Sequence, residues 1–225
     1  MNYKIVEIFD SIEGEGKRAG KTATFVRLAG CNLRCTYCDT TYAFGSEFEE
    51  IPLQKILARI KSRPYRRVTL TGGEPLLSPG VEVLIHEILI SGCEVNIETN
   101  GSIDISPLLR YLQNANCNPD ENLFFTMDYK LPASGVNDNM HLPNFPKLRP
   151  WDVLKFVVGS DSDVSHMVSY IKTLTSAPQI YIGAVHGMYN LQTLVQTILE
   201  TPELANATLQ LQLHKIIWDA SERGV

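Results

Sequence analysis

The chain has 225 residues, of which 44% are hydrophobic and 20% are charged, the composition of an ordinary globular protein with room for a substantial core. Its formal net charge of −5 at pH 7 argues against direct nucleic-acid binding and against binding to an anionic membrane surface. No apolar run is long enough to cross a membrane and no signal-peptide pattern opens the chain, so we expect a cytoplasmic protein with reduced thiols.

Short β-branched runs alternate with helical patterns along the chain. Strands are predicted at residues 23–29, 67–71, 94–98, 123–127, 153–158, 180–185 and 209–213. Helices are predicted at residues 52–63, 81–90, 108–113, 164–175 and 191–199. This alternation favours a mostly parallel sheet with helices on one side. Because a closed βα barrel needs about eight strands, we predict an α/β fold with an open, partial βα barrel of about six parallel strands.

The whole chain, residues 1–225, is predicted to form a single domain. Residues 30–45 form a loop after the first predicted strand, and this loop contains three of the five cysteines. Residues 131–150 are rich in Pro and Asn and lack a periodic pattern, which indicates either a lid or an inserted loop.

Cys31, Cys35 and Cys38 form a CxxxCxxC pattern in the 30–45 loop. Three thiolates on a cubic [4Fe–4S] cluster leave one iron open. An open iron suits chelation by the amino and carboxylate groups of S-adenosylmethionine, whose cleavage on cluster reduction yields a 5′-deoxyadenosyl radical. This spacing is similar to that of the radical S-adenosylmethionine enzymes.

Two other interpretations of the cysteines are weaker. A structural zinc site needs a second cysteine pair or spaced histidines, whereas the five histidines are scattered singly along the chain. A disulfide framework conflicts with the odd cysteine count and with the length of the chain. Cys93 and Cys117 each stand alone and are predicted to be structural thiols.

Polar motifs follow the predicted parallel strands at the ends where such folds place their chemistry. TGGEP follows residues 67–71, ETNG begins at Glu98, and Asp128-Tyr129-Lys130 follows residues 123–127. Glu74 of TGGEP suits a cationic amino group, although an ordinary glycine turn explains the run equally well. Arg27 within the first strand calls for an anionic partner, either a substrate carboxylate or a structural ion pair.

Several motifs occur in a fixed order along the chain. They are SIEGEG from residue 11, a strand that carries Arg27, GCNLRCTYCDT from residue 30, TGGEP from residue 71, ETNG from residue 98 and QLHK from residue 212. Together they resemble the 7-carboxy-7-deazaguanine synthase family of radical S-adenosylmethionine enzymes. The resemblance implies conversion of 6-carboxy-5,6,7,8-tetrahydropterin to 7-carboxy-7-deazaguanine for queuosine or another 7-deazapurine, with loss of ammonia and regeneration of S-adenosylmethionine.

The same resemblance implies the cofactors and partners. It implies a [4Fe–4S] cluster, S-adenosylmethionine and a Mg²⁺ ion held by Thr40. It also implies a small-molecule pterin substrate, a reductant such as flavodoxin and a homodimer. The family's substrate contacts fall on Ile12, Glu13, Gly14, Glu15, Arg27, Thr71, Glu98 and His214. Its cofactor contacts fall on Tyr37, Asp39, Gly73, Glu74, Asp128, Tyr129 and Lys130, with Gly183 and His186 as further candidates.

The chain departs from the family pattern in four places: Glu13 stands where many relatives have glutamine, Asp128-Tyr129-Lys130 stands where many have Ser-Pro-Lys, the 131–150 loop lacks a clear counterpart, and the tail continues eleven residues past His214. Two rival functions also fit part of the sequence. A glycyl-radical activating enzyme would share the cluster and the cofactor, but the SIEGEG run and Glu98 favour a small heterocycle. A non-enzymatic iron–sulfur protein would need a fourth protein ligand and no TGGEP run.

Overall fold

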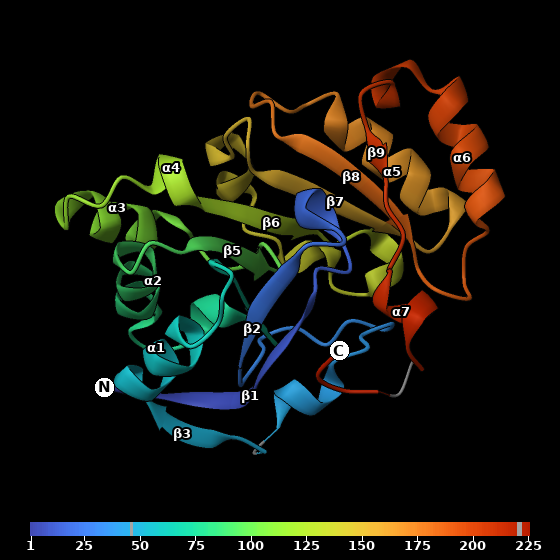
Figure 1. Ribbon diagram of the computed structural model, residues 1–225. Helices are drawn as coiled ribbons and strands as arrows, with labels where there is room; N and C mark the ends of the chain where they lie inside the picture. The colour runs from blue at the N-terminus through green and yellow to red at the C-terminus, as the bar shows by residue number, and fades with distance from the viewer. Residues whose placement is uncertain (46, 220–221) are drawn as a thin grey trace.

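The computed structural model describes residues 1–45, 47–219 and 222–225. Within these residues one sheet has the strand order β3-β1-β2-β4-β5-β6-β7-β8-β9 (Figure 1). Its parallel part consists of β2 (Thr22–Leu28), β4 (Arg67–Gly72), β5 (Glu94–Thr99), β6 (Leu123–Tyr129), β7 (Val153–Val158), β8 (Gln179–Ala184) and β9 (Thr208–Leu209). The order begins at β3 and ends at β9 without closing, which confirms the predicted open, partial barrel.

An antiparallel extension at the N-terminal edge of the sheet was not predicted. Strand β1 (Asn2–Ile12) pairs antiparallel with β2 and also with β3 (Glu49–Pro52). Tyr3 and Ile5 are buried, but the register of β1 against β2 shifts between Ile5 and Glu7. This irregularity interrupts the alternation of buried and exposed positions by which a strand is recognised in a sequence.

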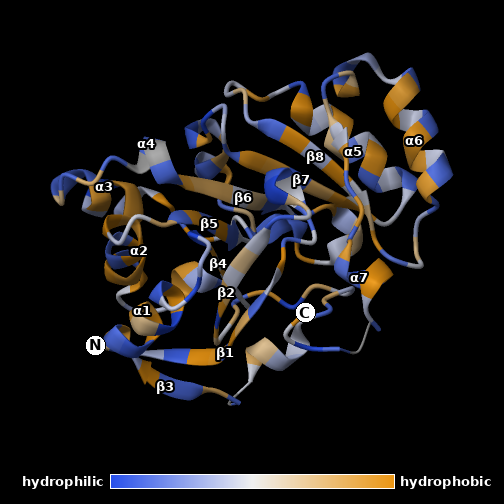
Figure 2. Cartoon of the chain, in the orientation of Figure 1, coloured by the Kyte–Doolittle hydropathy of each residue, from blue (hydrophilic) through white to orange (hydrophobic). Residues whose placement is uncertain are grey.

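The helices lie where the apolar periodicity placed them. They are α1 (Leu53–Lys61), α2 (Val81–Ile90), α3 (Ser106–Asn114), α5 (Asp161–Ile171) and α6 (Leu191–Glu200), with a short α4 (Pro119–Asn122) before β6. Figure 1 shows α1, α2 and α3 beside the first half of the sheet and α5 and α6 beside the second. Hydrophobic residues concentrate on β6, β7 and α2 (Figure 2). Among the described residues, no helix has the length and apolar character needed to cross a membrane.

Alternation along the parallel strands gives the sheet an apolar face and a polar face. On β7, Leu154 and Phe156 belong to the hydrophobic core, whereas Lys155 between them lines a cavity. On β6, Met127 belongs to the core and Asp128 lines the same cavity. Successive side chains of a strand point to opposite faces, so the helices cover one face and the polar residues share the other.

The last predicted strand, residues 209–213, is wrong in its extent. Strand β9 contains Thr208–Leu209 alone, and a short helix, α7 (His214–Ile217), follows. The backbone of Gln210 still donates a hydrogen bond to Ile182 O at 2.9 Å, but its side-chain Oε1 accepts one from Gly16 N at 3.1 Å. The chain therefore leaves the sheet at Gln210, and His214 begins a helix rather than lying in a strand.

Residues 131–150, predicted to be either a lid or an inserted loop, form an inserted loop that packs against the rest of the chain. They contain three 3₁₀ turns, η4 (Pro132–Ser134), η5 (Asn137–Asn139) and η6 (Leu142–Lys147). Phe145 is fully buried, and the buried Asn144 side chain donates hydrogen bonds to Gly101 O and Ile103 O. These contacts fix the segment against the loop that follows β5.

Candidate active site

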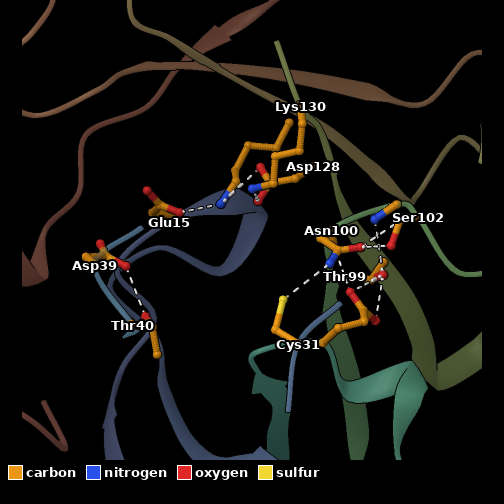
Figure 3. Close-up of polar contacts among 12 residues, drawn as sticks. Glu15, Cys31, Asp39, Thr40, Thr99, Asn100, Ser102, Asp128 and Lys130 are labelled. Atoms are coloured by element: carbon orange, nitrogen blue, oxygen red, sulfur yellow. Dashed lines mark hydrogen bonds and ion pairs between the residues drawn. The ribbon is translucent and has the colours of Figure 1, made fainter. Parts of the chain in front are cut away.

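A cavity of about 500 Å³ opens at the carboxyl ends of the parallel strands. Its walls come from the cysteine loop, the ends of β2, β4, β5, β6 and β7, and the C-terminal segment. Most of the predicted site residues line it: Ile12, Gly14, Glu15, Arg27, Cys31, Cys35, Tyr37, Cys38, Asp39, Thr40, Thr71, Gly73, Glu98, Asp128, Lys130, His186 and His214. Figure 3 shows part of the cavity, with the cysteine loop and the strand ends facing each other.

The three cysteines of the loop are free, half-buried thiols. Cys31 Sγ accepts hydrogen bonds from Leu33 N at 3.4 Å and from Asn100 Nδ2 at 3.7 Å (Figure 3). Burial raises the pKa of the Cys35 and Cys38 thiols above the ordinary value, so these thiols need a bound metal to stay deprotonated. The loop thus presents three potential ligands along one wall of the cavity.

The arrangement of these thiols suits a cluster better than a single ion. Among the described residues, no three Cys, His, Asp or Glu side chains converge where one metal ion would sit. A [4Fe–4S] cluster binds each thiolate to a different iron, so its ligands stand farther apart than those of a mononuclear site. The donor set therefore fits a cluster with one iron left for another ligand.

The paired glycines of TGGEP bring the end of β4 against the base of the cysteine loop. A β-carbon on Gly72 would stand 2.2 Å from Leu28 O, and one on Gly73 would stand 2.3 Å from Gly30 O. The backbone of Glu74 donates a hydrogen bond to Gly30 O at 2.8 Å. Glycine is therefore required at both positions by the neighbouring chain itself, and not only by a ligand.

Glu74 lies behind the cavity wall rather than in it. Its fully buried carboxylate accepts hydrogen bonds from Thr99 Oγ1 at 3.0 Å and from Asn100 N at 2.7 Å. Burial raises its pKa to about 7, while hydrogen bonds from Asn100 and Leu76 oppose the shift. Glu74 thereby orients Asn100, the residue that contacts Cys31 (Figure 3).

Two lysines and two carboxylates form an ionic cluster in the same cavity. Lys155 Nζ lies 2.8 Å from Glu15 Oε2 and 3.4 Å from Asp128 Oδ1, while Lys130 Nζ lies 2.9 Å from Asp128 Oδ2. Figure 3 shows Glu15, Asp128 and Lys130 gathered above the cysteine loop. The four side chains come from three parts of the chain and join the β1–β2 turn to the ends of β6 and β7.

Glu98 is a cavity-lining carboxylate whose pKa, like that of Glu74 behind the wall, is raised to near neutral pH. Burial raises its pKa to about 7, and the negative charges of Glu13 and Glu15 act in the same direction. The positive charge of Lys155 and a hydrogen bond from Thr71 oppose the shift. A carboxylate with this pKa gains much from a ligand that brings N–H donors to it.

Arg27 forms a structural ion pair, one of the two kinds of anionic partner expected from the sequence. Its Nε donates a hydrogen bond to Glu7 Oε1 at 2.6 Å, and Tyr42 Oη donates one to the same oxygen at 3.1 Å. The guanidinium also lies 5.7 Å from the centre of the Tyr42 ring. Arg27 nevertheless lines the cavity, so the ion pair with Glu7 aims its remaining N–H groups and does not exclude an anionic ligand.

The turn after β1 is in tight contact with the C-terminal segment. A β-carbon on Gly14 would stand 2.4 Å from His214 Nδ1, and Leu213 N donates a hydrogen bond to Gly14 O at 3.0 Å. Burial lowers the pKa of His214, although Glu15 and Asp39 favour its charged form. Burial thus favours the neutral imidazole of His214, which lies against Gly14 at the cavity.

Thr40 and Asp39 form a polar pair at the end of the cysteine loop. Thr40 Oγ1 donates a hydrogen bond to Asp39 Oδ1 at 3.0 Å (Figure 3), and Lys215 Nζ lies 2.8 Å from Asp39 Oδ2. Burial alone would raise the pKa of Asp39, but Lys215 and Thr40 outweigh it and lower the pKa to about 2. Asp39 is therefore ionised throughout the physiological pH range.

Four predicted residues do not line the cavity as the structure describes it: Glu13, Glu74, Tyr129 and Gly183. The buried carboxylate of Glu13 binds Arg18 and Thr69 below the cavity. Tyr129 points to the helix side, where its hydroxyl lies 3.1 Å from His166 Nε2 and its ring stacks on Tyr170. Gly183 faces Gln210, which a β-carbon would approach to 3.4 Å.

Several cavity residues were missed by the sequence analysis, among them Tyr42, Thr126, Lys155 and Lys215. Lys155 could have been predicted from the sequence, because it is a lone charge inside the apolar run 153–158, just as Arg27 is within 23–29. Tyr42 and Lys215 could not be predicted in this way, because Tyr42 is uncharged and Lys215 lies outside the predicted apolar strands.

The chain is similar to known proteins in both sequence and fold. Residues 26–120 match the Radical SAM superfamily. The 7-carboxy-7-deazaguanine synthase of Clostridium acetobutylicum is 43% identical over 230 residues, covering all of both chains. That of Methanospirillum hungatei is 34% identical and covers 95% of this chain and 85% of its own. The crystal structure of QueE from Escherichia coli shares the fold, with a TM-score of 0.75 at 23% identity over 94% of each chain.

Proposed function

The chain belongs to the 7-carboxy-7-deazaguanine synthase family of the Radical SAM superfamily, and we propose that it converts 6-carboxy-5,6,7,8-tetrahydropterin to 7-carboxy-7-deazaguanine with loss of ammonia. One observation supports this proposal above the others. The three free cysteines share a single cavity with Glu98, Arg27 and His214, which offer a carboxylate, a guanidinium and an imidazole to a polar heterocycle.

The family membership implies a [4Fe–4S] cluster and S-adenosylmethionine, and Cys31, Cys35 and Cys38 are the residues that would hold the cluster. When bound, the cluster and S-adenosylmethionine supply a 5′-deoxyadenosyl radical for removing a hydrogen atom from C6 of the pterin. The chain's own part is to bind, orient and enclose the reacting groups. The packing of Gly73 against Gly30 and the hydrogen bond from Asn100 to Cys31 hold the loop ready for this role.

For S-adenosylmethionine we propose the cavity residues next to the cysteine loop: Tyr37, Asp39, Gly73, Asp128, Lys130 and His186. The N–H groups of Gly73 and Glu74 already donate to Leu28 O and Gly30 O, so the backbone carbonyls of this stretch are the groups that would suit the amino group of S-adenosylmethionine. Glu74 contributes from behind the wall by orienting Asn100, rather than by facing the ligand. Tyr129 and Gly183 do not line the cavity as described, so we leave them out of this set.

For the pterin we propose the opposite wall: Ile12, Gly14, Glu15, Arg27, Thr71, Glu98 and His214. The pyrimidine ring presents paired N–H donors, which match the two oxygens of the Glu98 carboxylate. Arg27 uses its Nε for the ion pair with Glu7 and retains its other N–H groups for the substrate carboxylate. Glu13 supports this wall from below through its ion pair with Arg18.

We propose a Mg²⁺ ion at Thr40 between the protein and the substrate carboxylate. Thr40 lines the cavity, and the ionised Asp39 beside it adds a negative charge. One oxygen of Asp39 accepts the Thr40 hydrogen bond and the other pairs with Lys215. Mg²⁺ takes few protein oxygens and keeps several waters, so one hydroxyl and one substrate carboxylate suffice.

The proposed partners are an electron donor such as flavodoxin and a second copy of this chain. Asn32, Arg34 and Thr36 lie between and beside the cysteines and are exposed, so a cluster held by this loop would be within reach of a donor. For the dimer, the exposed residues Leu191 and Leu199 of α6 offer an apolar face, 42% and 75% exposed. Size-exclusion chromatography of the wild type and Leu199→Lys tests this contact.

The experiment that tests the function is the conversion itself. The protein is reconstituted with iron and sulfide without oxygen, then incubated with S-adenosylmethionine, a reductant and 6-carboxytetrahydropterin. We expect a product with the mass of 7-carboxy-7-deazaguanine and the release of ammonia. Formation of 5′-deoxyadenosine without any change in the pterin would instead point to another radical reaction.

A further inference from the structure

Lys155 occupies a central position that the family motifs do not mark. It lies on β7, in register beside Asp128 of β6, and its side chain is 12% exposed. Its ammonium lies 2.8 Å from Glu15 Oε2 and 3.4 Å from Asp128 Oδ1. One cation thus joins a carboxylate of the proposed pterin wall to a carboxylate of the proposed cofactor wall.

The ammonium of Lys155 is a permanent charge at neutral pH. Burial would lower its pKa, but Asp128, Glu15 and Glu98 outweigh burial and raise the pKa well above the ordinary value. A group so firmly protonated is a poor proton donor in a reaction near pH 7. Lys155 therefore suits electrostatic positioning and not acid catalysis.

Glu15 depends on an external contact for its orientation. It is the extended residue before the turn η1 (Gly16–Arg18), and its side chain makes no capping hydrogen bond there. Lys155 binds Oε2 of Glu15, which leaves lone pairs on Oε1 for a ligand. Without the ammonium, Glu15 would lose its cationic partner among the carboxylates of Asp128 and Glu98, and Lys130 would offset the charge of Asp128 alone.

We propose that Lys155 is a positioning residue for the pterin: its ammonium holds the Glu15 carboxylate aimed into the cavity, so that the free oxygen of Glu15 accepts a ring N–H. The proposal rests on the function proposed above, because it takes the ligand to be a pterin. Through Asp128 the same ammonium fixes the geometry of the cofactor wall relative to the pterin wall.

A double-mutant cycle on pterin affinity tests this role, with affinities measured by anaerobic titration calorimetry on the reconstituted enzyme. Glu15→Ala and Lys155→Met should each weaken pterin binding by about tenfold or more. If Lys155 acts through Glu15, Lys155→Met should cost less than about twofold in the Glu15→Ala background, at a pH high enough to keep Glu98 ionised in every variant. An equal loss in both backgrounds would overturn the proposal, because Lys155 would then act on the ligand directly or only on the fold.

Three further variants keep the cycle interpretable. Lys155→Gln serves if Lys155→Met does not fold, since its amide keeps a hydrogen-bond donor without the charge. Lys155→Arg keeps the charge and should restore part of the affinity. Lys147→Met is the matched control, because Lys147 also binds a carboxylate, Asp104 at 3.0 Å, but lies outside the cavity as described. It should leave pterin affinity unchanged.

A ligand-free measurement separates failure of this proposal from failure of the proposed function. The charge of Lys155 lowers the pKa of Glu98, against the effects of burial, Glu13 and Glu15, and Thr71 acts with Lys155. A ¹³C NMR titration should therefore show a higher Glu98 pKa in Lys155→Met than in the wild type. If the wild type binds no pterin, the proposed function fails. If the Glu98 pKa is the same in Lys155→Met as in the wild type, the placement of Lys155 beside Glu98 is wrong.

Discussion

The β-carbon that Gly73 lacks would stand 2.6 Å from Cys31 Cβ. No side chain fits in this space, so the end of β4 and the base of the cysteine loop meet backbone to backbone. This contact fixes the distance between the cysteine loop and the end of β4. It thereby fixes where the three thiols lie relative to the rest of the cavity.

Gly73→Ala is therefore expected to displace the cysteine loop. Iron content after reconstitution should fall by more than about half, because a β-carbon within 3 Å of backbone and side-chain atoms forces one of them to move. Gly45→Ala is the matched control, since a β-carbon on Gly45 meets nothing within 4 Å and its φ is −93°. Equal iron content in Gly73→Ala and Gly45→Ala would show that the loop does not depend on this contact.

The cluster assignment makes a simple prediction about the cysteines. Cys31→Ala should lose the absorbance of the cluster and all cleavage of S-adenosylmethionine, because each thiolate is the only protein ligand of its iron. Cys117→Ala should keep both, since Cys117 is half-buried and lies outside the cavity as described. Loss of the cluster in a folded Cys117→Ala protein would contradict the assignment.

The pKa of Glu98, raised to about 7 by burial, predicts a pH-dependent affinity for the pterin. The carboxylate that accepts N–H donors is present above pH 7 and is protonated below it. Pterin affinity in the wild type should therefore fall by about tenfold between pH 8 and pH 6. In Glu98→Gln the affinity should be low throughout, and this part of the pH dependence should disappear. A Glu98→Gln protein that keeps the wild-type slope would remove Glu98 from the pterin site.

The same raised pKa has a consequence for the ligand-free fold. Between the ordinary carboxyl pKa and about 7, the folded protein binds a proton at Glu98 that the unfolded chain does not, so stability falls as pH rises through this window. Glu98→Gln should consequently increase the free energy of unfolding at pH 8 and leave it nearly unchanged at pH 4. Urea unfolding of both proteins at the two pH values measures this, and a destabilised Glu98→Gln at pH 8 would contradict it.

Much of this architecture follows from the sequence, because β-branched runs and amphipathic helices alternate without ambiguity from 67 to 127. The same alternation also shows one error of interpretation. Tyr129 stands between Asp128 and Lys130 on a strand end, so it must point to the opposite face, and the structure stacks it on Tyr170.

Other features depend on contacts between distant residues, which no local pattern predicts. Gly16 N binds the side chain of Gln210 across 194 positions, and Lys155 binds Glu15 across 140. The shortening of β9 and the role of Lys155 both follow from such pairs. The strand β1 was missed for a different reason, since its register shift hides the alternation that identifies strands.

Thr40→Val tests the proposed Mg²⁺ site at nearly constant side-chain volume. Turnover should drop by about tenfold or more and should no longer respond to Mg²⁺, because the hydroxyl oxygen that would bind the ion is gone. Thr41→Val is the control, since Thr41 is the next residue and also lines the cavity. Wild-type stimulation by Mg²⁺ in Thr40→Val would rule out this position.

The most direct test of the central claim uses 6-carboxytetrahydropterin labelled with deuterium at C6. If the cavity brings C6 to a 5′-deoxyadenosyl radical and S-adenosylmethionine is regenerated, mass spectrometry should find 7-carboxy-7-deazaguanine together with deuterium in S-adenosylmethionine. Recovery of unchanged, fully labelled pterin beside newly formed 5′-deoxyadenosine would contradict the account, because the radical would then have formed without reaching this substrate.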